Sequence, residues 1–131
     1  MNWTLILIGN LIMDSTIALF AILTSLESHY LRIVDEKYSL RDSIDKAGEL
    51  YKKQFEDNPV MKSMLEDGDE VSEQLKKSIK SFWDSSDKCL FDADEYYNKA
   101  KLFSPFTTRR IIFISALFVL GIMLQIEGIL L

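Results

Sequence analysis

Basic residues are absent from both ends of this 131-residue chain, because every lysine and arginine lies between Arg32 and Arg110. The chain also has only one cysteine, one histidine, two prolines and five glycines. The single cysteine, Cys89, excludes an intrachain disulfide framework. His29 has no partner at metal-ligand spacing. These absences exclude a disulfide-stabilised secreted domain and a histidine–cysteine metal centre.

Each end of the chain is instead an apolar segment. One runs from about Trp3 to Leu26 and the other from about Ile111 to Leu131. A helix needs about 20 apolar residues to cross roughly 30 Å of hydrocarbon, so both segments are long enough. The first lacks a basic n-region and a small-residue cleavage site and carries Asp14. A retained membrane helix is therefore a better interpretation than a cleaved signal peptide.

Almost all charge lies in the middle of the chain, where 15 basic and 18 acidic residues leave a net charge of about −3. A nucleic-acid platform would need a basic stripe, so we expect no nucleic-acid partner. Because basic segments are retained on the cytoplasmic side, the middle should be cytoplasmic and both termini outside, in a multi-pass protein of a bacterial inner membrane. We expect Trp3, Arg109 and Arg110 to anchor the membrane boundaries.

Two sets of helix breakers divide the middle of the chain into two arms. The segment 57–59 (Asp-Asn-Pro) predicts a helix stop, because proline disfavours the helical conformation in the residue before it. Gly68 marks a second stop, with Asp67 or Asp69 as the N-cap of the helix that follows. Residues 60–66, between the two stops, have room for one or two helical turns.

The arms, residues 27–57 and 70–103, carry apolar residues at spacings of three and four, as helices packed side by side do. Their short connection makes them antiparallel. After a third break at Ser104-Pro105, proline fits the first turn of the helix that enters the membrane. The predicted contact stripes are Leu40, Ile44, Ala47, Tyr51 and Phe55 on the first arm, and Leu75, Ile79, Phe82, Cys89, Ala93, Tyr96, Ala100 and Phe103 on the second, which Ser86 interrupts.

The second arm is apolar over a wide arc, because Phe82 and Trp83 are adjacent and point about 100° apart. Two bare helices bury only a narrow contact, so the surplus favours packing against other copies or a partner. We expect Phe82, Trp83, Phe91 and Tyr96 at this arm interface. The fold prediction is an all-α membrane protein with transmembrane helices over 1–26 and 105–131, joined by a long cytoplasmic antiparallel helical hairpin over 27–104.

A stripe of small and polar residues runs along one face of the first apolar segment. It consists of Asn10, Asp14, Ala18, Ala21, Ser25 and Ser28. Asp14 lies about 18 Å from Leu26 and therefore near the bilayer midplane, where an acid that faces lipid costs several kcal/mol. Three readings stay open: hydrogen bonding within a helix interface, lining of a pore or ion path, or another role. The hydroxyl of Thr16 points elsewhere and can bond to its own backbone.

The second apolar segment carries Gly121, Gln125 and Gly128 on one face, which suits close contact between helices. We interpret Glu127 as an acid that snorkels to the outer rim. The chain has no glycine-rich phosphate loop, Ser/His/Asp set or HExxH motif, and its acidic turn at 66–70 lacks EF-hand spacing. We therefore expect neither an enzyme nor a bound metal or cofactor.

Two spans around a long helical insert resemble, in topology and size, the small two-transmembrane effectors of bacterial antiphage systems, such as those paired with retrons or with cyclic-nucleotide signalling. The resemblance implies a homo-oligomeric effector or channel that permeabilises the lipid bilayer, gated through its cytoplasmic arms, in antiphage defence. The same features allow a membrane-anchored scaffold that docks a soluble cytoplasmic protein on the arms. The arms also look like the cytoplasmic hairpin of the membrane insertases, but the third span and the basic groove residue of that family are missing.

Overall fold

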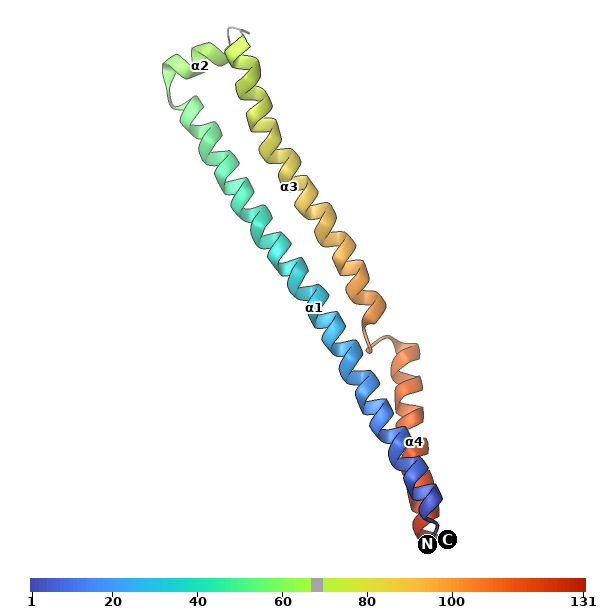
Figure 1. Ribbon diagram of the computed structural model, residues 1–131. Helices are drawn as coiled ribbons and strands as arrows, with labels where there is room; N and C mark the ends of the chain where they lie inside the picture. The colour runs from blue at the N-terminus through green and yellow to red at the C-terminus, as the bar shows by residue number, and fades with distance from the viewer. Residues whose placement is uncertain (67–69) are drawn as a thin grey trace. The chain divides into compact units, whose positions relative to one another are not determined.

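The computed structural model describes residues 1–66 and 70–131, with the side chains of all these residues except 55, 61, 64–66 and 70–72. The described chain is all-α, and its two long helices pack antiparallel, as the sequence predicts (Figure 1). The predicted stop at Gly68 and the N-cap at Asp67 or Asp69 lie outside the described residues. The helices are α1 (Trp3–Glu56), α2 (Pro59–Glu66), α3 (Glu70–Phe103) and α4 (Thr108–Leu130).

The stop predicted at residues 57–59 is confirmed. Helix α1 runs unbroken for 54 residues, with no proline in its interior, and ends at Glu56. Pro59 begins the short helix α2, where its missing N–H would have had no helical partner. Asn58 caps this helix, since its Oδ1 accepts a hydrogen bond of 3.1 Å from the backbone N–H of Val60.

The joint before the last helix is confirmed, but the place predicted for its proline is wrong. Pro105 lies in the connection between α3 and α4, and α4 begins only at Thr108, after the extended N-cap Thr107. The reason is that Ser104 organises a turn of its own. Its hydroxyl accepts a bond of 3.3 Å from the N–H of Phe106, and its carbonyl accepts one of 2.9 Å from Arg110.

The chain divides into two compact units, which we call the span unit (Met1–Tyr30 with Lys99–Leu131) and the arm unit (Leu31–Asn98). In the span unit the two chain termini lie at the same end, so α4 runs antiparallel to the start of α1 (Figure 1). Two helices, within Trp3–Gln54 and Glu73–Leu130, are long and apolar enough to cross a membrane by length and composition. Only 11% of each apolar window is buried, whereas the core helix of a soluble protein would be mostly buried.

In the arm unit, small residues of α3 bring the two helices close together. Ser86, Cys89 and Ala93 are buried against α1, so Ser86 continues the predicted stripe of the second arm rather than interrupting it. From α1, Val34 and Gly48 are buried at the same contact. A Cβ atom on Gly48 would lie 3.1 Å from the Cβ of Phe82, which explains why a glycine is accommodated there.

The stripe predicted for the first arm is partly wrong. Ile44 and Tyr51 are half-buried as expected, and the Tyr51 ring lies 5.6 Å from that of Phe82. Leu40 and Ala47 are exposed, because the contact is centred on the face of Val34 and Gly48. At about 100° per residue, Leu40 lies well to one side of that face.

Candidate functional site

The α1–α4 contact of the span unit is built on glycines whose backbones touch. A Cβ atom on Gly9 would lie 2.6 Å from the carbonyl oxygen of Gly121, and one on Gly121 would lie 3.0 Å from the carbonyl oxygen of Gly9. At the chain termini, a Cβ atom on Gly128 would lie 2.9 Å from the oxygen of Asn2. Such approach at small residues is how helices associate in lipid, where no hydrophobic force draws them together.

Polar bonds close the end of this contact nearest the termini. The backbone N–H of Asn2 donates to the carbonyl of Gly128 over 2.6 Å. The side-chain amide of Gln125 donates to Oδ1 of Asn10, which joins α4 to α1 directly. Thr16 is buried at the contact, and its hydroxyl donates to the carbonyl of Ile12 over 2.7 Å, as the sequence suggests for this residue. Each of these three donors therefore has an acceptor within the protein.

The predicted polar stripe divides at this contact. Gly121, Gln125 and Gly128 lie on the α4 face against α1, and Asn10 lies at the edge through its bond to Gln125. The remaining stripe residues are all exposed: Asp14, Ala18, Ala21, Ser25 and Ser28.

Asp14 lies on the opposite side of α1 from the glycine contact. The five residues from Gly9 to Asp14 turn the helix by about 140°, and the two from Asp14 to Thr16 turn it by about 200°. The sequence reading missed Gly9, which lies seven residues before Thr16 and so shares its face. The spacing of seven, which Gly121 and Gly128 repeat on α4, is the signal that identifies it.

Asp14 has no polar partner among the described residues of its own chain. Its side chain is exposed, and among the described residues none forms a hydrogen bond or ion pair with it. In water this would be unremarkable, but in the middle of an apolar helix the ionised carboxylate needs water or another protein group. Helix α4 packs on the opposite side of α1 and therefore does not provide such a group.

Two open, apolar hollows lie beside the α1–α4 contact, and Thr16 lines both. One, of about 330 Å³, is lined by residues that include Ile17, Phe20 and Phe118. The other, of about 300 Å³, lies on the other side of Thr16 and is lined by residues that include Leu11 and Leu117. Neither hollow has a charged side chain in its lining.

The predicted boundary residues lie at the starts of the two span helices. Trp3 is the first residue of α1 and is exposed. Arg109 is exposed in the first turn of α4, and Arg110 donates to the Ser104 carbonyl. Basic side chains oppose the dipole at a helix N-terminus, so helix stability does not explain this arginine pair. Aromatic residues beside the pair include Phe106, whose ring meets that of Phe20 edge-on at 5.7 Å.

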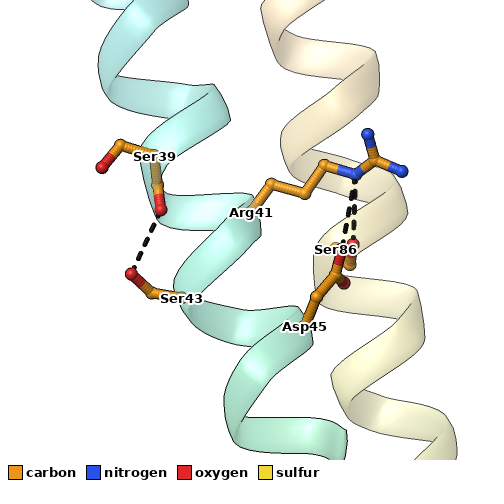
Figure 2. A network of polar contacts seen from close by, with 5 residues as sticks. All are labelled: Ser39, Arg41, Ser43, Asp45 and Ser86. Carbon is orange, nitrogen blue, oxygen red and sulfur yellow. Dashed lines mark hydrogen bonds and ion pairs between the residues drawn. The ribbon is translucent and has the colours of Figure 1, made fainter.

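A polar network crosses the arm unit where the two helices meet (Figure 2). The Arg41 side chain extends from α1 toward α3, where its Nε donates to the Ser86 hydroxyl over 3.4 Å. The same Nε lies 3.9 Å from Oδ2 of Asp45, whose Oδ1 is buried without a hydrogen-bond partner among the described residues. Lys37 and Asp92 form a second cross-helix pair at 3.6 Å.

The residues predicted at the arm interface fall into two groups. Phe82 and Tyr96 are half-buried, with Phe82 against Gly48 and Tyr51 of α1. Trp83 and Phe91 remain 37% and 70% exposed. Helix α1 therefore does not bury all the aromatic side chains of α3.

Within residues 1–66 and 70–131, no group of three or more His, Cys, Asp or Glu side chains is placed to hold a metal ion. Comparisons with protein-family models, with curated proteins and with solved structures found no match.

Proposed function

We propose that this chain is a homo-oligomeric membrane effector whose two spans permeabilise or perturb the bilayer. The observation that carries the proposal is the position of Asp14, exposed on the face of α1 that α4 leaves uncovered. A carboxylate near the middle of a span is tolerated only beside protein or water. Copies that turn this face toward a shared axis would provide both.

The orientation that we propose places the arms in the cytoplasm and both termini outside. The pair Arg109 and Arg110 supports it, because this pair opposes the helix dipole of α4 and yet stands at the start of a span, as retained positive charge does. The test is cysteine labelling in a Cys89→Ser background. A probe at Asn2 should react from outside, and one at Ser63 only after permeabilisation; the reverse pattern would refute the orientation.

The arms are proposed to act as the gate. Helix α1 runs unbroken from Trp3 to Glu56, so a partner or signal that repacks the arms has a continuous helix through which to turn the first span. The resemblance to two-transmembrane antiphage effectors supports defence against phage as the setting. In that setting the trigger would appear on infection and act on the arms.

Membrane potential tests the effector proposal. Unregulated expression should depolarise bacterial cells and slow growth, and Asp14→Leu should abolish both effects while insertion continues. Ser15→Leu is the matched control, because Ser15 is exposed and adjacent but about 100° away around the helix. Asp14→Asn separates two mechanisms: a conducting path loses cation preference without the charge, whereas a hydrogen-bonded interface keeps its activity.

A scaffold that docks a soluble protein is the second candidate, and the exposed Trp83 and Phe91 on α3 favour it. A scaffold has no use for Asp14. Under this alternative, overexpression leaves the membrane potential unchanged and Asp14→Leu behaves as the wild type does in every assay. The purified protein would then be a monomer in detergent that forms a stoichiometric complex with its partner.

A further inference from the structure

We propose that one side of the arm unit is a docking face for a basic amphipathic helix of a soluble protein. The inference rests on the proposed function in that it names what engages the arms. Five apolar side chains form the face and four aspartates border it. The face consists of Leu31, Tyr38, Trp83, Leu90 and Tyr97, and the border consists of Asp35, Asp42, Asp87 and Asp94.

The five apolar residues lie on one side of the helix pair. Leu31 and Tyr38 stand three before and four after the buried Val34, and Leu90 and Tyr97 stand in the same way about the buried Ala93. Trp83 similarly precedes the buried Ser86 by three. Each offset turns a side chain about 40–60° from the contact in the same rotational sense. In an antiparallel pair, equal rotations on both helices lead to the same side.

The pairing of the arms brings these residues to similar levels. The ion pair of Lys37 with Asp92, at 3.6 Å, places the neighbourhood of Tyr38 opposite that of Leu90. Trp83 is 37%, Tyr38 41% and Tyr97 44% exposed. Single exposed apolar residues are normal, whereas several that adjoin on one side indicate a contact surface.

The spacing of the face fits a helix. Leu31 and Tyr38 are seven residues apart, as are Trp83 and Leu90, and Leu90 and Tyr97. Seven is the repeat of contact positions between packed helices. From Trp83 to Tyr97 the face is about 21 Å long, so it would take about four turns of a third helix laid between the arms.

The four aspartates make most of the border of the face acidic. Asp35, Asp87 and Asp94 each stand three residues before a face residue, and Asp42 stands four after Tyr38, so they lie one step farther from the contact. All four are exposed, and none has an ion-pair partner among the described residues.

Two exposed basic residues, Lys46 (four after Asp42) and Lys80 (three before Trp83), stand at the Trp83 end of this border, whereas the basic residues of α1 nearer the helix contact are engaged. Lys37 pairs with Asp92, and Arg41 pairs with Asp45. An apolar surface edged mainly by carboxylates complements lysine or arginine on the flanks of the bound helix. It complements neither an acidic helix nor an anionic lipid surface, which attracts basic segments.

A second copy fits the face poorly. Copies that share one membrane and one orientation lie parallel, so identical faces would set the aspartates of one copy against the aspartates of the other. Like charges in contact oppose association. The homo-oligomer that we propose is therefore expected to form through the spans and to leave this side of the arms open for the partner.

Trp83 makes the test direct, because the chain has only two tryptophans. In full-length Trp3→Phe protein in uncharged detergent, its emission reports on this face alone. The probe is a synthetic helical peptide with leucine at the heptad contact positions and lysine elsewhere. It should shift the Trp83 emission to the blue and protect it from acrylamide quenching, saturably and less so at high salt. The same peptide with glutamate in place of lysine should do neither.

Matched substitutions locate the binding. Changing the four border aspartates to asparagine, or Leu90→Ala alone, should weaken binding of the lysine peptide about tenfold or more, equivalent to about 1.4 kcal/mol. Asp84→Asn and Leu40→Ala, which are exposed but off this face, should leave it unchanged. Absence of binding, or equal weakening by the control substitutions, would overturn the proposal.

Two further outcomes separate this proposal from the proposed function. Protection of Trp83 that rises with protein concentration in the absence of peptide would assign the face to a second copy and overturn the inference. A protein that fails to bind the peptide but still depolarises cells would refute the docking face and leave the effector intact. Peptide binding by a protein that never depolarises cells would support the face and favour the scaffold.

Discussion

The span unit and the arm unit are both antiparallel helix pairs, but different kinds of contact hold the two helices together in each. In the span unit, backbone meets backbone at Gly9 and Gly121, and no charged side chain crosses between the helices among the described contacts. In the arm unit, charged side chains of α1 reach across to α3. Arg41 donates to the small residue Ser86, and Lys37 pairs with Asp92. The glycine contact suits the lipid that we propose around the span unit, and the charged contact suits water around the arm unit.

The same kind of residue therefore has a different meaning in each unit. An exposed aspartate on the arms, such as Asp84, is solvated and needs no explanation. Asp14 is equally exposed, but it lies within an apolar segment that we propose to span the membrane, where lipid cannot solvate a carboxylate. In that setting Asp14 would need a partner outside its own helix pair.

The largest expected effect is that of a proline in the arm part of α1. Ile44→Pro removes a helical hydrogen bond from the middle of the arm and should cost about 3 kcal/mol. Ile44→Ala, the control, keeps the helix and removes only a half-buried side chain. Circular dichroism of the full chain in detergent should show a large loss of helix for the proline variant. Equal helix content in the two variants would contradict an unbroken α1.

Alanine in place of one glycine in each unit tests the contrast between the units. Gly9→Ala drives a Cβ atom to 2.6 Å from a backbone oxygen, and overpacking of this kind costs about 1–3 kcal/mol. Gly48→Ala meets the side chain of Phe82 at 3.1 Å, and its better helix propensity, worth about 1 kcal/mol, offsets the crowding.

The measurement for both glycine variants is the yield of a disulfide cross-link between cysteines placed at Ile12 and Leu117, in a Cys89→Ser background. These two residues line the same hollow. Gly9→Ala should lower the yield, and Gly48→Ala should leave it unchanged. If the two variants behaved alike, the glycine contact would not be what holds the spans together.

Much of the fold follows from the sequence because its breaks are sharp. Proline at 59 and the Ser104-Pro105 joint place the helix ends, and a period of three and four on α3 places Cys89 and Ala93 in the contact. The prediction for the contact face of α1 in the arms is wrong at Leu40 and Ala47, which are exposed. Apolarity alone does not reveal that close packing on α3 favours Gly48 over the larger leucine.

Less of the candidate site than of the fold could be predicted from the sequence. A helical period identifies which residues share a face, and Asp14, Ala18 and Ser25, which share one, are all exposed on α1. It does not tell which face meets the neighbouring helix, and Gly9 was missed for that reason. The Asn10–Gln125 bond joins residues 115 apart in sequence, and no local pattern specifies such a pairing.

The smallest expected effects concern the single polar bonds of each unit. Gln125→Leu removes the bond to Asn10 and should destabilise the span pair by about 1 kcal/mol, the usual value between membrane helices. Ser86→Ala removes a long bond of 3.4 Å from a partly solvated arginine and should cost about 0.5 kcal/mol or less. Thermal unfolding of both variants in the same detergent gives the comparison. A larger loss for Ser86→Ala would reverse the ranking of the two contacts.

Disulfide cross-linking between copies tests the central claim most directly, since the claim is that the uncovered stripe of α1 faces another copy. In a Cys89→Ser background, single cysteines at Ala18 and Ser25 sit on the stripe, whereas Ser15 and Met123 are exposed but off it. On oxidation in native membranes, the two stripe positions should give dimers and the two control positions should not. Equal yields at all four positions, or no dimer at either stripe position, would contradict the account.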